Sequence, residues 1–125
     1  MSREIIHTDD AMKPFAGYSH AVKAAGLVFV SGQGPFDPAG NLIGESIQAQ
    51  ARQCLTNVSA ILTAAGSAIE KVVSATIILA EEGDFVGMNE EWGKWFTTNP
   101  TARQGAKRPV RPQNMKISIA VIAEA

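Results

Sequence analysis

Hydrophobic residues follow two different periods along this chain of 125 residues, one typical of strands and one of helices. Mostly apolar, β-branched runs at 27–33 and 72–79 are bounded by turn-forming or polar residues, which predicts two buried strands. Residues 116–123 alternate, with Ile117, Ile119 and Val121 on one face, which predicts a third strand. Shorter strands are expected at 4–7, around 102–106, and at 17–24, where Ala25-Gly26 makes a hairpin turn.

The helical period occurs in two segments. Apolar residues at steps of three and four run from Ile47 to Ala65, with Ser46 as the expected N-cap and Gly66 as the expected stop. A second helix is predicted to start at Asp84, and its apolar face is expected to join the core. That face consists of Phe85, Met88, Trp92, Trp95 and Phe96.

The predicted order of elements is β-β-β-α-β-α-β-β, in a single domain over residues 1–125. Crossover connections are right-handed, so both helices should cover the same face of one mixed sheet. The other face carries small or apolar residues such as Ala120 and Ile122. We expect another copy of the chain to bury it, which predicts a symmetric homo-oligomer.

Composition and charge narrow the classes of partner. With 46% hydrophobic and 18% charged residues and a net charge of -1, the chain is globular and has no general attraction to phosphate. No aromatic residue is interleaved in its one basic cluster, so nucleic-acid binding is not expected. The cluster consists of Arg103, Lys107, Arg108, Arg111 and Lys116. Neither a secretory signal nor a membrane span is visible, and a cytoplasmic location is expected.

Common catalytic and metal-binding motifs are missing from the sequence. The only cysteine, Cys54, falls on the apolar stripe of the first helix, and His7 and His20 do not have metal-ligand spacing. No metal site is therefore predicted. The pair Gly32 and Gly34 is followed by Pro35 and more loop, which does not fit a dinucleotide-binding turn.

Three residues have both an ordinary and a functional interpretation. The hydroxyl of Ser31 ends a buried strand, so it either bonds to nearby backbone or faces a ligand beside two glycines. Arg103 is either a surface arginine or, with small neighbours, a planar clamp for a carboxylate. Tyr18, the only tyrosine, is either a half-buried ring or part of a site.

Several stretches together resemble the Rid family of reactive intermediate deaminases, formerly called YjgF proteins. The resemblance spans residues 14–123 in the family's order and spacing. It implies an α+β, chorismate-mutase-like fold and a homotrimer with ligand clefts between subunits. It also implies hydrolysis of 2-imino or enamine acids, such as 2-iminobutanoate, without a cofactor. The stretches are 17–22, 27–37, 50–53, Asn89 with Trp95-Phe96, and Ala102-Arg103.

By position, the resemblance places the family's carboxylate-binding arginine at Arg103, its tyrosine at Tyr18 and its serine at Ser31. Backbone near Ser31 and Gly105 would hold the carboxylate or the attacking water, and Gly32 is expected to contact the substrate. Asn89 is a further expected substrate-binding residue.

The sequence departs from the family pattern at three positions of the expected site. Ala120 stands where the family has a glutamate that activates water, Gly105 replaces a frequent cysteine, and His20 replaces a glutamine. Loss of a general base costs roughly 10²- to 10⁴-fold in rate. Tyr18, His20 or product ammonia would have to activate water, in a larger pocket with Ala120 in its wall.

Two classes of function therefore stay open. The first is a deaminase, whose substrate could be a bulkier acid of the aminomuconate type. The second is a trimer that binds a small carboxylate without turnover and has a regulatory or interaction role.

Overall fold

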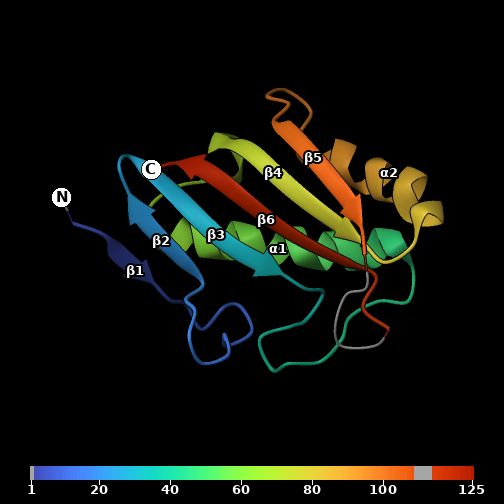
Figure 1. The fold of residues 1–125 in the computed structure, drawn as a ribbon, viewed down its shortest axis with the longest axis horizontal. Coiled ribbons are helices and arrows are strands. Elements are labelled where there is room, and N and C mark those ends of the chain that lie inside the picture. Colours follow the sequence, from blue (N-terminus) through green and yellow to red (C-terminus); the bar gives the residue numbers. More distant parts are fainter. Residues whose placement is uncertain (1, 109–113) are drawn as a thin grey trace.

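The computed structural model describes residues 2–108 and 114–125, and its elements follow the predicted order (Figure 1). The strands are β1 (Glu4–Ile6), β2 (Ala21–Ala24), β3 (Leu27–Gln33), β4 (Val72–Leu79), β5 (Ala102–Lys107) and β6 (Ile117–Glu124). The helices are α1 (Ile47–Ala64) and α2 (Phe85–Trp95), with the single-turn 3-10 helices η1 (Ile69–Lys71) and η2 (Glu82–Asp84). No helix in the described ranges is both long and apolar enough to span a membrane.

The six strands form one sheet in the order β1-β2-β3-β6-β4-β5. β4 and β5 are parallel, and every other neighbouring pair is antiparallel. This confirms the predicted mixed sheet of six strands. The C-terminal strand β6 lies in the middle, where Ile122 pairs with Phe29 of β3 and Ala120 pairs with Thr76 of β4.

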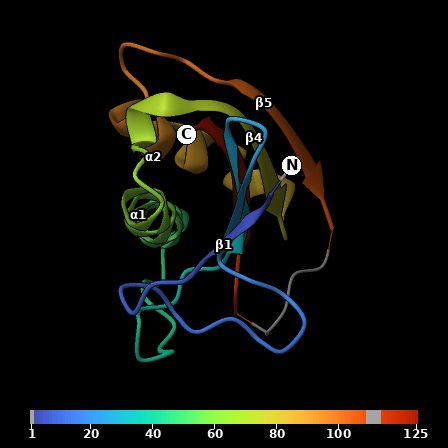
Figure 2. The same ribbon diagram turned by 90° about the vertical axis from the view of Figure 1, so that its left-hand side faces the viewer.

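Both α-helices lie on the same side of the sheet, as predicted (Figure 2). The core forms between them and the alternate strand positions that face them. Cys54, Leu55 and Val58 of α1 are completely buried, as are Ile117 and Ile119 of β6. Burial raises the pKa of the Cys54 thiol, which fits the inert role expected for it.

The predicted ends of α1 are confirmed by their capping geometry. The backbone N–H of Ala49 donates to Oγ of Ser46 over 3.0 Å. Gly66, just after the helix, has φ of +80°, a conformation that favours glycine.

Two details differ from the sequence-based expectation. β2 begins at Ala21 rather than at residue 17, and Gly17 has φ of +98°, which is incompatible with a strand. Met88 and Trp92 are buried as expected, but Phe85 remains 49% exposed. The reason is that α2 begins beside β5, an edge strand exposed along its whole length. Arg111 of the basic cluster lies outside the described residues.

The sheet face turned away from the helices is open, and its β4, β5 and β6 positions are uncharged except for Glu124 at the end of β6. Strand register places these residues in rows, such as Ala120, Thr76 and Gln104. The full set is Ser74, Thr76, Ile78, Ala102, Gln104, Ala106, Ser118, Ala120, Ile122 and Glu124. This is the face on which another copy of the chain was predicted to pack.

Candidate functional site

Arg103 lies on the side of β5 that faces the helices. It pairs in register with the buried residue Ala75 of the parallel strand β4, and paired residues project to the same side. The guanidinium carbon Cζ lies 5.4 Å from the ring centroid of Trp92 and 5.8 Å from that of Phe85. Both distances allow a cation–π interaction. The guanidinium is thus exposed yet held in place by two aromatic rings from α2.

No carboxylate of the described residues lies within ion-pair distance of Arg103. The two ion pairs found there join Arg52 and Lys94 to Glu91. The N–H groups of the Arg103 guanidinium therefore have no internal anion to compete with a bound one. This supports the clamp interpretation of Arg103 over that of an ordinary surface arginine.

A groove of about 480 Å³ surrounds Arg103 between β5 and the start of α2. That volume falls in the usual range for small-molecule sites. Its apolar lining comes from Ile77, Leu79, Phe85 and Met88, and its polar lining from Glu82, Arg103, Gln104 and Lys107, with Gly105 and Ala106 between them. The groove thus combines an apolar wall with a few charged groups.

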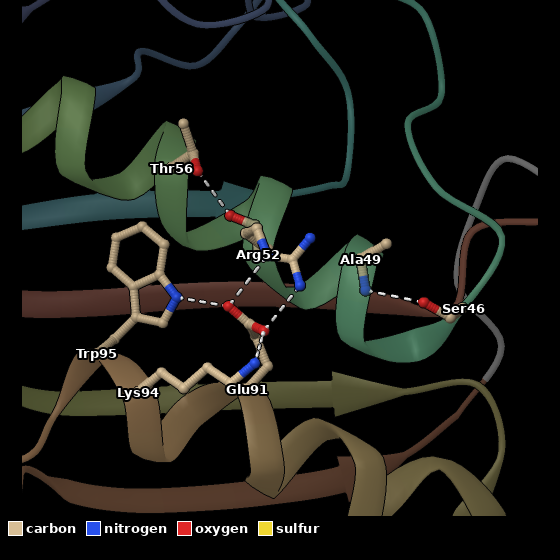
Figure 3. A network of polar contacts seen from close by, with 7 residues as sticks. All are labelled: Ser46, Ala49, Arg52, Thr56, Glu91, Lys94 and Trp95. Carbon is tan, nitrogen blue, oxygen red and sulfur yellow. Dashed lines mark hydrogen bonds and ion pairs between the residues drawn. The ribbon is translucent and has the colours of Figure 1, made fainter.

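The position of α2 is fixed by a buried carboxylate, Glu91, whose side chain is 3% exposed (Figure 3). Nε and Nη2 of Arg52 on α1 donate to its two oxygens over 3.3 and 3.2 Å, and Nε1 of Trp95 donates over 2.9 Å. Burial by itself would raise the pKa of Glu91. Hydrogen bonds from Trp95 and Arg52, and the charges of Arg52 and Lys94, outweigh burial and lower this pKa below its usual value. The ionised Glu91 therefore ties α2 to α1.

A second pocket, of about 400 Å³, lies at the opposite part of the sheet and holds Tyr18, His20 and Gly32. Gly32 approaches β6 closely, because a Cβ on it would lie 2.9 Å from Oγ of Ser118. Ser118 also lines this pocket. The Tyr18 ring is 45% exposed and packs edge-on against Phe15, with centroids 6.4 Å apart.

Ser31 and His20 both bond to backbone near this second pocket. Oγ of Ser31 donates to the Ser19 carbonyl over 2.7 Å. This hydroxyl therefore bonds to nearby backbone, the first of the two interpretations of Ser31. His20 is 2% exposed; its Nε2 lies 2.8 Å from the Met12 carbonyl, and its Nδ1 lies 3.2 Å from the Thr8 N–H. Since the carbonyl can only accept, Nε2 carries the proton and Nδ1 accepts. A catalytic role for either residue stays a prediction.

The structure brings the predicted site residues into two groups rather than one. Arg103 and Gly105 line the groove, while Tyr18, His20 and Gly32 line the second pocket. β6 and β4 lie between β3 and β5. Three strand spacings amount to about 14 Å. Within one chain, the two groups therefore line separate pockets.

The remaining predicted residues line neither pocket. Ser31 borders the second pocket through its neighbour Gly32, Asn89 lies half-buried on α2, and Ala120 lies on the open sheet face. Within the described ranges, no group of three or more His, Cys, Asp or Glu side chains is placed to hold a metal ion.

The aromatic partners of Arg103 and the lysine in its groove were not identified from the sequence. Phe85 and Trp92 were assigned to the core because their spacing matches a helical stripe. Lys107 was counted only as a member of a basic cluster. One signal for the lysine is present in the sequence. In a short strand, every second residue projects to the same side, which places Lys107 on the side of Arg103 and Gly105.

Comparison with known proteins gives the following matches. Residues 8–125 match the family model described as Endoribonuclease L-PSP. A RutC family protein of Pyrococcus horikoshii is 38% identical over 122 residues, covering 97% of each chain. The 2-iminobutanoate/2-iminopropanoate deaminase of Capra hircus is 35% identical over 122 residues, covering 97% of this chain and 89% of its own.

Solved structures match over nearly the whole chain. The Rid family protein YyfA of Yersinia pestis, described as of unknown function, superposes with a TM-score of 0.94 at 29% identity, covering 99% of this chain and 100% of its own. TdcF of E. coli with bound serine superposes with a TM-score of 0.90 at 30% identity, covering 98% of each chain.

Proposed function

Since this chain belongs to the Rid (YjgF/RutC) family, we propose that it hydrolyses 2-imino acids such as 2-iminobutanoate to the 2-oxo acid and ammonia. The goat relative is named as a deaminase of such acids. The observation that carries the proposal is the guanidinium of Arg103, held by two rings in a groove and without an internal ion pair.

Arg103 would bind the substrate carboxylate through two parallel N–H···O bonds. A planar fork matches a carboxylate in this way and fixes its orientation. The rings of Phe85 and Trp92 limit the rotation of the guanidinium, so less freedom is lost on binding. Holding the carboxylate also holds the neighbouring imine carbon in place for attack.

The hydrolysis needs only water as a second reactant. Water adds its oxygen to the imine carbon, the C=N π electrons move to nitrogen, and a proton transfers from water to nitrogen. In the resulting carbinolamine, the hydroxyl proton transfers to the amino nitrogen. The C–N bond then breaks, its electron pair leaves with nitrogen as ammonia, and the oxygen forms the C=O bond of the 2-oxo acid. A group that accepts the first proton accelerates the reaction.

Ala120 cannot be that proton acceptor, because a methyl group has no lone pair. Tyr18 and His20 are the candidate groups in the chain, and product ammonia is a third. His20 would have to release one of its two backbone bonds to take a proton. Tyr18 needs no such change, since its ring is exposed in its pocket.

The complete site would form between copies of the chain in a homotrimer. The groove of one copy would meet the Tyr18 pocket of another. Two observations support this arrangement: the two groups line separate pockets within one chain, and the open sheet face carries mostly small, apolar or neutral polar side chains in β4, β5 and β6.

A non-catalytic carboxylate-binding trimer is the second candidate function. The observation that favours it is the methyl group of Ala120 in place of a base. Such a protein would keep the Arg103 clamp and lose turnover.

The deciding experiment measures ammonia release from freshly generated 2-iminobutanoate, compared with its hydrolysis in buffer. We expect the wild type to accelerate release and Arg103→Ala to abolish the acceleration. Arg108→Ala is the matched control, because Arg108 is an exposed neighbour that does not line the groove. No acceleration by the wild type, together with Arg103-dependent binding of 2-oxobutanoate, would favour the non-catalytic alternative.

A further inference from the structure

Arg103 is not the only cation in its groove, because Lys107 lines the same groove. Arg103 pairs with Ala75 and Lys107 pairs with Leu79, and both of these β4 residues are buried against the helices. The two cations therefore project to the same side of β5. Lys107 comes four positions after Arg103 in the strand, which places their Cα atoms about 13 Å apart.

The space between the two cations is open. Gly105 is the one residue between them that projects to the same side, and it has no side chain. A Cβ there would lie 3.2 Å from the Ile77 carbonyl oxygen, so a larger residue would crowd the groove floor. Phe85 and Met88 supply an apolar wall along this space. An extended carbon chain would fit the stretch between the cations.

The charges of the groove favour a ligand with more than one negative group. Of the described residues that line the groove, Glu82 alone is acidic, whereas Arg103 and Lys107 are cationic. Among the described residues, Lys107 has no carboxylate within 4.0 Å, and neither has Arg103. A monocarboxylate would satisfy Arg103 and leave the Lys107 end of the groove empty.

We propose that this groove selects dicarboxylic acids, with one carboxylate on Arg103 and the second on Lys107. The inference rests on the proposed function, and it specifies the preferred substrate as a 2-imino diacid with an extended chain. The guanidinium of Arg103 is held by two rings, but the four-carbon stem of Lys107 is flexible, so the ammonium can approach the guanidinium to much less than the distance between the Cα atoms. Glu82, which lines the same groove, opposes the second carboxylate and weakens its binding without preventing it.

Binding of stable 2-oxo acids, measured by titration calorimetry, tests the proposal without turnover. The probes are 2-oxobutanoate, 2-oxoglutarate and 2-oxoadipate, which have one, two and two carboxylates. We expect at least one diacid to bind the wild type more tightly than 2-oxobutanoate, by about fivefold, as for an exposed ion pair. Lys107→Met should remove this preference, and Glu82→Gln should increase it.

The matched control is Arg108→Met, which removes one positive charge at the adjacent residue, outside the groove. It should leave the ratio of diacid to monoacid affinity unchanged. If it lowers the ratio as much as Lys107→Met does, the preference comes from overall charge and the proposal is wrong.

Other outcomes separate this inference from the proposed function. Diacids that bind no more tightly than 2-oxobutanoate, with all binding lost in Arg103→Ala, would overturn the role of Lys107 and keep the clamp. Binding that does not depend on Arg103 would overturn both. Ammonia release from the matching imino acids should follow the same order of preference as binding.

Discussion

The guanidinium of Arg103 is oriented by aromatic faces rather than by a carboxylate. A carboxylate partner would have to be displaced by the substrate, at a cost in affinity. Aromatic rings contact the face of the guanidinium plane and leave its N–H edge available for a bidentate bond. This arrangement suits an arginine that must bind an external anion.

Replacing one of these aromatic side chains by an aliphatic one should weaken anion binding without unfolding the protein. Phe85 is half-exposed, so Phe85→Leu should change thermal stability little. Loss of one cation–π contact, worth about 0.5–1 kcal/mol at an exposed site, should raise the dissociation constant for 2-oxobutanoate about two- to fivefold. Val86→Ala, on an exposed neighbour outside the groove, serves as the control for titration and melting. Unchanged affinity in Phe85→Leu would show that Phe85 does not hold the guanidinium.

Ala120→Glu places a carboxylate at the position where the resemblance to the family predicts a water-activating glutamate. We expect the rate of ammonia release from 2-iminobutanoate to rise, within the roughly 10²- to 10⁴-fold range that a positioned base contributes. Ala120→Gln has nearly the same size without the basic group and should give no increase. A lower rate in the glutamate variant would instead indicate a site remodelled for another substrate.

At the scale of elements, α2 connects the core to the groove. Its Glu91 is bound to Arg52 of α1, while Phe85 and Trp92 of the same helix contact Arg103 of β5. The ionised form of Glu91 is therefore part of what positions the groove wall.

The contribution of Glu91 to stability should depend on pH. The pKa of Glu91 is lowered in the folded state, so its stabilisation is complete above the pKa of an unfolded glutamate, about 4.3, and is lost as the pH falls through the lowered value. Glu91→Gln should lower the free energy of unfolding by about 1 kcal/mol at pH 7, because Arg52 is half-exposed.

Urea unfolding of the wild type and Glu91→Gln at several pH values measures this difference. We expect it to shrink toward zero below about pH 4.3. The exposed neighbour Glu90 provides the control, since Glu90→Gln should show little difference at any pH. A Glu91 effect that does not change with pH would mean that its charge is unimportant.

The bounds of strands β3 and β4 could be predicted because apolar runs rich in β-branched residues end at clear breaks in the pattern. The start of β2 could not, because alternation alone does not reveal that Gly17 adopts positive φ. The groove could not be predicted from the sequence either. β5 reads Ala-Arg-Gln-Gly-Ala-Lys, without an apolar side, so only its register with β4 shows that Arg103 faces Phe85.

At the scale of the whole molecule, the open sheet face is not covered by any helix or strand of the described residues. Apolar and small residues such as Ile78 and Ile122 lie on it among neutral polar ones. Burial by copies of the chain would remove this surface from water and bring two pockets together. The complete site would then exist only in the assembled oligomer.

Thr76→Lys places a charge at the centre of this face and should dissociate the oligomer. On a single chain, the lysine would remain solvated, so the fold should be kept. Thr63→Lys is the control, since Thr63 is exposed on α1 on the opposite side of the sheet. Sedimentation at micromolar concentration should give an oligomer for the wild type and Thr63→Lys, and a single chain for Thr76→Lys. A wild type that sediments as a stable monomer would contradict the proposed assembly.

Mixing two inactive variants tests whether each site draws residues from two copies. Arg103→Ala lacks the clamp and Tyr18→Ala lacks the ring of the second pocket, so each alone should release ammonia slowly. After subunits exchange in an equal mixture, about a quarter of the sites would combine an intact Arg103 with an intact Tyr18 from a different chain. Recovery of about that fraction of wild-type activity is expected. A site built within one chain would give no recovery, because every chain in the mixture carries one of the two substitutions.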